Sequence, residues 1–179
     1  MDDIIKEIKK GDKAAFEALV QEYHAKVFSL CMGLVSNRED ALDLTQEVFI
    51  KIYRSASSFK GDSKLSTWIY RVVQNTCVDF LRRERRYTAV PLPDVLTDTS
   101  PSPYEITAAA EDREKVRSAL LSLPADYKSA LLLREYEGLS YSEIADVLGI
   151  SEGTVKSRIS RARAALAKKL TEKAEQNRI

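Results

Sequence analysis

The stretch from Leu139 to Lys169 constrains the fold more than any other part of this 179-residue chain. Ser140 precedes Glu143 by three residues, which is the spacing of a capping box at the start of a helix. Gly149 can take the left-handed backbone conformation that ends a helix, and Ser151 can then cap a second one. We therefore predict two helices separated by a tight turn. The buried face of the first helix is expected to hold Ile144, Ala145 and Leu148.

The second of these helices has an apolar face and a basic face. At about 100° per residue, its apolar side chains fall in one narrow sector: Val155, Ile159, Ala162 and Leu166. Small and basic side chains point the other way or flank them: Gly153, Lys156, Ser157, Arg158, Ser160, Arg161, Arg163 and Lys168. Small residues let a helix enter a DNA groove, and cations reach phosphates and guanine edges. The pattern favours the DNA-reading helix of a helix-turn-helix over a solvated basic face on an ordinary helical hairpin.

Charge is segregated along the chain, although the formal net charge is only +1. Any nucleic-acid surface must therefore come from local clusters rather than from overall basicity. One cluster lies in the second helix just described, and another contains Arg82, Arg83, Arg85 and Arg86. The composition, 44% hydrophobic and 31% charged, is typical of soluble helical proteins.

Several classes of protein are disfavoured by what the sequence lacks. Its start is too charged for a signal peptide, and no apolar run is long enough to span a bilayer, so we expect a cytoplasmic protein without membrane insertion. Cys31 and Cys77 lie on separate apolar patterns and are expected to be reduced core thiols. His24 is the only histidine and makes no metal motif. Without a Gly-rich phosphate loop or a Ser/His/Asp set, we expect no catalytic residue, no metal and no cofactor.

The predicted fold class is all-α, with two small helical domains joined by a Pro-rich linker. We place a first domain at residues 1–87, the linker at 88–103, a second domain containing the helix-turn-helix at 104–172, and a tail at 173–179. The linker holds four of the five prolines, which prevent helix continuation. Helices are expected after a cap at Asp12, from about Arg38 after Asn37 breaks the preceding pattern, from about Tyr104 to Leu121, and from Pro124 towards Gly138.

Two surfaces of the first domain are ambiguous from pattern alone. The helix from about Arg38 is expected to pack its apolar residues, namely Ala41, Leu42, Thr45, Val48, Phe49, Ile52 and Tyr53. Its acidic opposite face suits a solvated surface. After a loop around Gly61, Ser63 or Ser66 is expected to cap a segment containing Trp68, followed by a helix through Asn75 to the arginine cluster. Interleaved aromatics and cations suit single-stranded nucleic acid, although Trp68 can equally be core.

These motifs together resemble the extracytoplasmic-function (ECF) sigma factors of bacterial RNA polymerase. The resemblance covers nearly the whole chain and rests on blocks in the family's order: 11–16, 43–49, 59–62, 66–71, 123–124, 139–145 and 153–158. It implies an alternative sigma factor that directs polymerase to specific promoters in a stress or envelope response. The implied partners are core RNA polymerase, through the largest-subunit coiled coil and the flap, promoter DNA, and an anti-sigma factor that could be membrane-anchored.

The resemblance also implies roles for individual residues. The polymerase-binding set is Asp43, Gln46, Glu47, Phe49 and Lys51. The set for the downstream promoter element, where a base is flipped from the non-template strand, is Lys64, Trp68, Tyr70, Arg71, Asn75, Arg82 and Arg83. The set for the upstream element is Thr154, Lys156, Ser157, Arg158, Ser160, Arg161 and Arg163. The downstream set holds few aromatic residues, chiefly Trp68 and Tyr70. In this it departs from a set in which many aromatic side chains stabilise the melted promoter.

Two other functions were weighed against this hypothesis. A stand-alone helix-turn-helix regulator would bind a palindrome as a dimer without polymerase, but it would not need the block from Asp43 to Phe49. A small enzyme with a DNA-binding tail lacks any catalytic motif to support it. We therefore expect a non-enzymatic protein that lends sequence specificity to polymerase.

Overall fold

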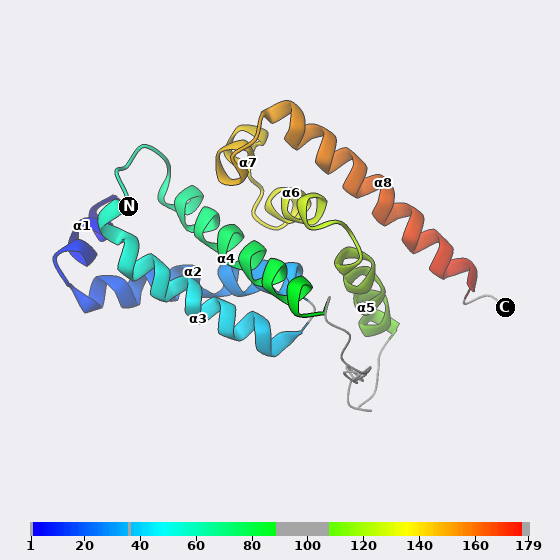
Figure 1. The fold of residues 1–179 in the computed structure, drawn as a ribbon, viewed down its shortest axis with the longest axis horizontal. Coiled ribbons are helices and arrows are strands. Elements are labelled where there is room, and N and C mark those ends of the chain that lie inside the picture. Colours follow the sequence, from blue (N-terminus) through cyan, green and yellow to red (C-terminus); the bar gives the residue numbers. More distant parts are fainter. Residues whose placement is uncertain (1, 36, 89–107, 177–179) are drawn as a thin grey trace.

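The structure is a computed structural model that describes residues 2–35, 37–88 and 108–176. All regular elements within these ranges are helical, which confirms the predicted fold class (Figure 1). The N-terminal half holds α1 (Asp2–Lys9), α2 (Lys13–Leu34), α3 (Arg38–Ser55), the short 3₁₀ turn η1 (Ala56–Ser58) and α4 (Leu65–Thr88). The C-terminal half holds α5 (Ala108–Leu121), α6 (Ala125–Glu135), α7 (Tyr141–Leu148) and α8 (Glu152–Gln176).

The predicted helix starts in the N-terminal half are confirmed by their caps. The Asp12 carboxylate accepts hydrogen bonds from the backbone amides of Ala14 and Ala15. The Asn37 side chain does the same for Glu39 and Asp40 at the start of α3. These bonds satisfy amides that have no partner within their own helix, so short polar side chains fix where both helices begin.

Helix α4 differs from its prediction. Leu65 to Thr88 form one continuous helix, where two successive segments were expected. Ser66 therefore lies inside the first turn and cannot be the N-cap. The helix also extends one residue into the predicted linker, at Thr88. The rest of the linker and residues 104–107 lie outside the described residues, so the domain bounds stay a prediction.

A single apolar core runs through both halves. In the N-terminal half it is formed where α2, α3 and α4 meet, around Leu30, Ile52 and Ile69. Cys31 and Cys77 also meet there, with their Sγ atoms 3.7 Å apart, and both are free thiols. The prediction of core thiols is confirmed, but the two cysteines are not isolated from each other, because the packing of α2 against α4 joins residues 46 positions apart in sequence.

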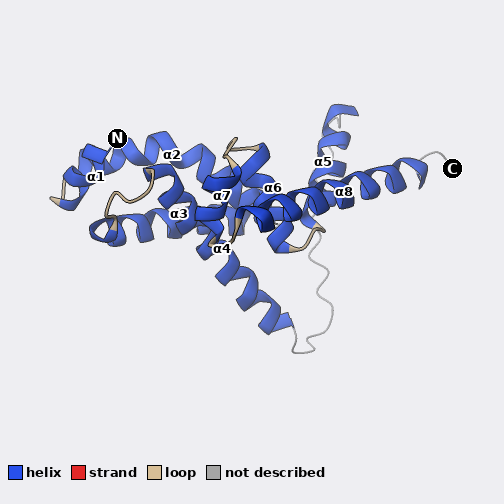
Figure 2. Cartoon of the chain, turned by 90° about the horizontal axis from the view of Figure 1, so that it is seen from above, coloured by secondary structure: helices blue, strands red, loops and turns tan. Residues whose placement is uncertain are grey.

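The two halves pack directly on one another. In Figure 1, α4 lies with α2 and α3 on one side and α7 on the other. Leu132 of α6 lies against Gly33 of α2, and buried residues form one continuous cluster across this boundary. Figure 2 shows α8 running along the outer side of the C-terminal half to the C-terminus. None of the helices in the described ranges is long and apolar enough to cross a membrane.

Candidate nucleic-acid interface

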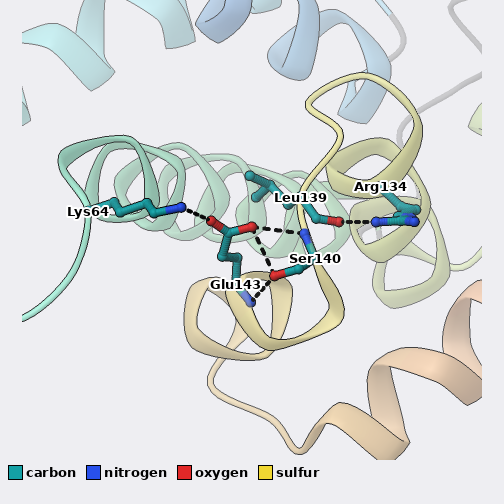
Figure 3. A network of polar contacts seen from close by, with 5 residues as sticks. All are labelled: Lys64, Arg134, Leu139, Ser140 and Glu143. Atoms are coloured by element: carbon teal, nitrogen blue, oxygen red, sulfur yellow. Dashed lines mark hydrogen bonds and ion pairs between the residues drawn. The ribbon is translucent and has the colours of Figure 1, made fainter.

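The turn between α7 and α8 forms as the sequence predicted. The backbone amide of Ser140 donates to Glu143 Oε2 at 2.9 Å, and the amide of Glu143 donates to Ser140 Oγ at 3.2 Å (Figure 3). Gly149 ends α7 in the left-handed conformation, at φ 66° and ψ 38°. Ser151 Oγ accepts a hydrogen bond from the Thr154 amide at 3.2 Å. The capping box, the glycine and the second cap together set the angle at which α8 leaves the turn.

The faces of α7 and α8 follow the amphipathic pattern with one correction. Val155, Ile159 and Ala162 are fully buried, while Leu166 is half-buried. In α7 Ile144 and Val147 are fully buried, and Ala145 and Leu148 are half-buried and pack against the core, so the predicted face is correct but Val147 was missed. A helix of eight residues gives few repeats from which to fix the phase of its pattern.

Burial of the apolar face of α8 leaves the opposite face exposed. We call this the DNA-type face, because it holds the small and basic side chains that were predicted to contact DNA. Lys156, Ser160 and Arg161 point into solvent. Thr154 and Ser157 are half-buried, and the Ser157 hydroxyl donates to the Thr154 carbonyl at 2.9 Å. The exposed set is therefore narrower than predicted, with a lysine, a serine and an arginine at its centre. An arginine or lysine can donate to guanine acceptors, and a serine can pair with either kind of base edge.

Three arginines of α8 contact polar groups on α6. Arg158 Nη2 donates to Asp126 Oδ2 at 2.9 Å, and Arg163 Nη2 donates to Glu135 Oε1 at 2.6 Å. Glu135 raises the pKa of Arg163, so that guanidinium stays charged. Arg161 Nη1 lies 3.5 Å from the Tyr127 hydroxyl. The carboxylates hold Arg158 and Arg163 at the flanks of the exposed face, where phosphates would approach.

A second cationic face lies on α4. Arg71, Asn75 and Arg82 are exposed and fall at intervals of four and seven residues, which places them on one side of the helix together with Lys64. Arg83 is exposed beside them. These members of the predicted downstream set therefore form a line along one side of α4.

The two aromatic residues of the downstream set are not freely exposed. Trp68 is half-buried, with its ring 5.4 Å from that of Phe59, so its environment favours the packing role that the sequence left open. Tyr70 is only 3% exposed, and its hydroxyl donates to Glu137. Burial, followed by that carboxylate, raises the pKa of Tyr70 and keeps the phenol neutral.

Asn75 lines a hollow of about 380 Å³ between α3 and α4. Its other walls are Lys51, Arg54, Ser55, Val72 and Thr76. Lys51 Nζ donates to Thr76 Oγ1 at 3.2 Å and pairs with Glu47 at 2.7 Å. Lys51 was predicted for the polymerase surface, but the structure places it beside the predicted base-contacting asparagine. Arg54 was missed in the sequence analysis, because the hollow forms only where α3 meets Val72, Asn75 and Thr76 of α4.

Helix α3 exposes apolar as well as acidic side chains. Leu42, Ile50 and Tyr53 are 39%, 50% and 44% exposed. The expectation that Leu42 and Tyr53 pack in the core was therefore wrong, and Ile50 was missed. Phe49 is instead 7% exposed and stacks on His24, so it supports the helix from inside. The signal that could have exposed the error is phase: the buried positions Ala41, Leu44, Thr45, Val48 and Ile52 keep helical spacing without Leu42, Ile50 or Tyr53.

Comparisons with known proteins match both halves of the chain. The family models for Sigma-70 region 2 and Sigma-70, region 4 match residues 19–87 and 113–166. The chain is similar to the RNA polymerase sigma-H factor of Pseudomonas aeruginosa, with 38% identity over 93% of this chain and 92% of that protein. It is 39% identical to the ECF RNA polymerase sigma-E factor of Escherichia coli, with the same coverage.

Two solved structures have a similar fold. One is the sigma factor RpoE from Bartonella quintana, solved in complex with the anti-sigma factor NepR, with a TM-score of 0.71, 28% identity and coverage of 87% of this chain and 96% of that one. The other is CnrH in complex with the cytosolic domain of CnrY, with a TM-score of 0.72 over 94% of this chain and 96% of that one. At 24% identity, the second shows similarity of fold alone.

Proposed function

The chain belongs to the ECF subfamily of bacterial RNA polymerase sigma factors, and we propose that its two halves divide the work of promoter selection. It is an alternative sigma factor, which directs RNA polymerase to promoters for transcription initiation. Polymerase supplies the chemistry of RNA synthesis, so this chain catalyses no reaction. The name of the subfamily favours a response to stress or to events at the cell envelope.

The exposed face of α3 is the proposed polymerase-docking surface. Asp43 and Gln46 are exposed next to the apolar side chains of Leu42 and Ile50. A mixed apolar and acidic strip of this kind suits one face of a coiled coil with basic residues, here in the largest subunit of polymerase. Glu47 adds negative charge to this surface and forms an exposed ion pair with Lys51. Phe49 does not contact polymerase in this proposal but supports α3 from the core. A contact between the C-terminal domain and the flap of polymerase completes the proposed docking.

The α4 face is the proposed site for the downstream promoter element. Arg71, Arg82 and Arg83 would follow the phosphates of the non-template strand, with Lys64 at the start of the helix. A base flipped from the duplex would enter the hollow beside Asn75, whose amide can pair with a base edge. Because extraction of a base costs a few kcal/mol, the hollow must hold it by packing and hydrogen bonds. Lys51 and Arg54 add positive charge at the same place.

The α8 face is the proposed reader of the upstream element. In this proposal Lys156, Ser160 and Arg161 contact base edges, while Thr154, Arg158 and Arg163 contact phosphates, with Ser157 between them. The single observation that carries the proposal is the exposure of the lysine, the serine and Arg161 on a helix whose opposite face buries Val155, Ile159 and Ala162. Such a helix can enter a major groove only with its polar face forward.

The remaining partners follow from these surfaces. An anti-sigma factor that covers the α3 or DNA-type faces would inhibit the protein, and it could be anchored in the membrane. We place the protein in the cytoplasm because polymerase and promoter DNA act there.

Run-off transcription tests this function. Purified core polymerase is combined with genomic promoter fragments, with and without the protein. We expect new transcripts that start at defined positions only when the protein is present. The absence of any redirected start on all templates would contradict the proposal.

A further inference from the structure

An apolar groove with a volume of about 730 Å³ lies where the C-terminal part of α2 meets α5. Its lining comes from α2, from α5 and from the residue that follows α6: Phe28, Ser29, Met32, Gly33, Arg113, Val116, Arg117, Leu120 and Tyr136. None of these residues belongs to the sets proposed for polymerase or DNA. The volume falls within the range of about 300–1,000 Å³ that is typical of pockets for small ligands.

The groove gathers apolar side chains that the fold leaves exposed. Within the described ranges, the exposed large hydrophobic residues lie either on α3 or in this groove. The two in the groove are Val116, which is 44% exposed, and Tyr136, which is 65% exposed. Leu120 is buried, and Phe28 and Met32 are half-buried. Exposed apolar surface that is gathered in a hollow is typical of a binding site.

Positive charge lies along one wall of this groove. Arg113 and Arg117 are four residues apart on α5, so they are neighbours on one face of the helix. Arg117 lies 3.5 Å from Glu114 in a pair that solvent screens, so its guanidinium can also bind an anion. A third guanidinium, that of Arg38, lies 5.3 Å from the centre of the Phe28 ring. The described residues that line the groove include no carboxylate, so its charge is complementary to an anion.

We propose that this groove binds a free single-chain amphiphile with an anionic headgroup, such as an alkyl carboxylate. The planar guanidinium groups of Arg113 and Arg117 match the geometry of a carboxylate, which one arginine can hold through two parallel hydrogen bonds. The alkyl chain lies against Val116, Leu120 and Met32, where its burial removes apolar surface from water. Each buried CH₂ group strengthens binding about fourfold.

The occupant is a free molecule rather than a lipid surface, because the lining comes from separate helices around a hollow instead of from one outward face. This site adds recognition of a small molecule to a protein whose other proposed ligands are macromolecules. It is independent of the proposed function, since it uses no side chain assigned to DNA or polymerase.

The first test compares ligands on the wild-type protein. Isothermal titration calorimetry measures the binding of sodium dodecanoate, kept below the concentration at which it forms micelles. Decanoate has the same head and two fewer carbons, and dodecyltrimethylammonium has the same chain and a cationic head. We expect dodecanoate to bind at one site and decanoate to bind up to about 15-fold more weakly. The cation should bind at least about tenfold more weakly, because it cannot accept hydrogen bonds from the arginines. Equal affinity for anion and cation, or no saturable binding of dodecanoate, would overturn the proposal.

The second test locates the binding with variants at exposed positions. Val116→Asp adds a carboxylate to the lining, and Arg113→Gln removes one contact to the headgroup. Each should weaken dodecanoate binding at least about tenfold. Lys13→Gln, at the opposite end of α2, also removes one positive charge and should bind as the wild type does. Wild-type affinity in Val116→Asp would place the binding elsewhere and overturn the proposal. The comparison of ligands on the wild type decides the matter if a variant fails to fold, which far-ultraviolet circular dichroism checks.

A sedimentation assay separates a free ligand from a lipid surface. Vesicles of phosphatidylcholine and phosphatidylglycerol present anionic headgroups whose chains are held in a bilayer. We expect the wild type and Val116→Asp to sediment equally with these vesicles, because the groove takes only a free chain. Sedimentation that is lost in Val116→Asp would assign the groove to a membrane surface and overturn the proposal of a free occupant.

Discussion

Glu143 performs two structural tasks with one carboxylate. It caps α7 through Ser140 and binds Lys64 across the boundary between the halves. The hydrogen bond from Lys64, followed by those from Ser140, lowers the pKa of Glu143 from 4.5 to about 2. The sequence predicted the first task from spacing alone, but the second depends on a residue 79 positions away.

This lowered pKa predicts a dependence of stability on acid. Because the folded pKa lies below the unfolded one, the ionised carboxylate stabilises the fold fully above about pH 4.5, and this contribution is lost as the pH falls towards 2. The melting temperature of the wild type should therefore fall more between pH 4.5 and pH 2 than that of Glu143→Gln, measured by thermal unfolding. The control is Glu172→Gln, at an exposed pair with Lys168. Parallel pH curves for wild type and Glu143→Gln would contradict the assignment.

Gln74 is a buried amide that the fold does not satisfy. It is 3% exposed, and neither its Nε2 nor its Oε1 atom has a hydrogen-bond partner among the described residues. A buried unpaired polar group costs about 1–3 kcal/mol. Gln74→Met, of similar shape, should therefore raise the free energy of unfolding by about 1–3 kcal/mol, measured by urea denaturation. A loss of stability would show that the amide has a partner in solution.

At the scale of elements, α3 and α8 expose opposite kinds of surface. Helix α3 combines acids with exposed apolar residues, whereas α8 combines small side chains with cations. In both helices the buried face is apolar and regular, so the exposed face carries the information about partners. This division allows each function to be removed without unfolding the protein.

Glu47→Lys should impair assembly with core polymerase. A like charge at an interface costs several kcal/mol, so we expect at least about a tenfold loss of affinity. The fold should tolerate the change, because exposed ion pairs within a helix contribute only about 0.3–0.5 kcal/mol. Affinity is measured by fluorescence anisotropy with labelled protein, and Glu17→Lys on the exposed side of α2 is the control. Normal assembly would mean that polymerase docks on another surface.

Arg161→Ala should weaken binding of the upstream element and leave core affinity intact. Loss of an arginine contact to a base costs about 1–3 kcal/mol, which corresponds to a loss of about 5–150-fold. The measurement is holoenzyme binding to a duplex promoter fragment chosen from the run-off assay. Lys168→Ala, later on the same helix, removes the same charge and is the control. An equal loss of DNA and core affinity would refute the assignment of the α8 face.

At the scale of the whole molecule, a buried lysine joins the two halves. Lys128 donates to the Leu34 carbonyl at the end of α2 and lies 3.4 Å from the Leu121 carbonyl at the end of α5. It therefore links three helices from both halves at one point. An ammonium group is placed in the core only because carbonyl oxygens surround its charge.

Lys128→Met should destabilise the packing between the two halves. It keeps the apolar stem but leaves the buried Leu34 carbonyl without this donor, which costs about 1–3 kcal/mol. The free energy of unfolding from urea denaturation should fall by this amount, while Lys13→Met at an exposed position should have little effect. Unchanged stability would show that the two halves separate readily in solution.

The local features of this protein follow from residues that are close together along the chain. The caps at Asp12 and Ser140, the turn at Gly149 and the faces of α8 depend on residues a few positions apart, so hydrogen bonding and helical period suffice to predict them. Family resemblance on ordered motifs then gave the function.

Contacts between residues far apart in the chain became known from the packing of the helices. The contact of Cys31 with Cys77, the hollow around Asn75 that includes Lys51 and Arg54, and the exposure of Leu42 and Ile50 all depend on how whole helices pack. So do the contacts of Tyr70 with Glu137 and of Lys64 with Glu143 across the boundary between the halves. No local pattern encodes such pairings, because they arise from the fit of complete surfaces between helices rather than from the order of neighbours along the chain.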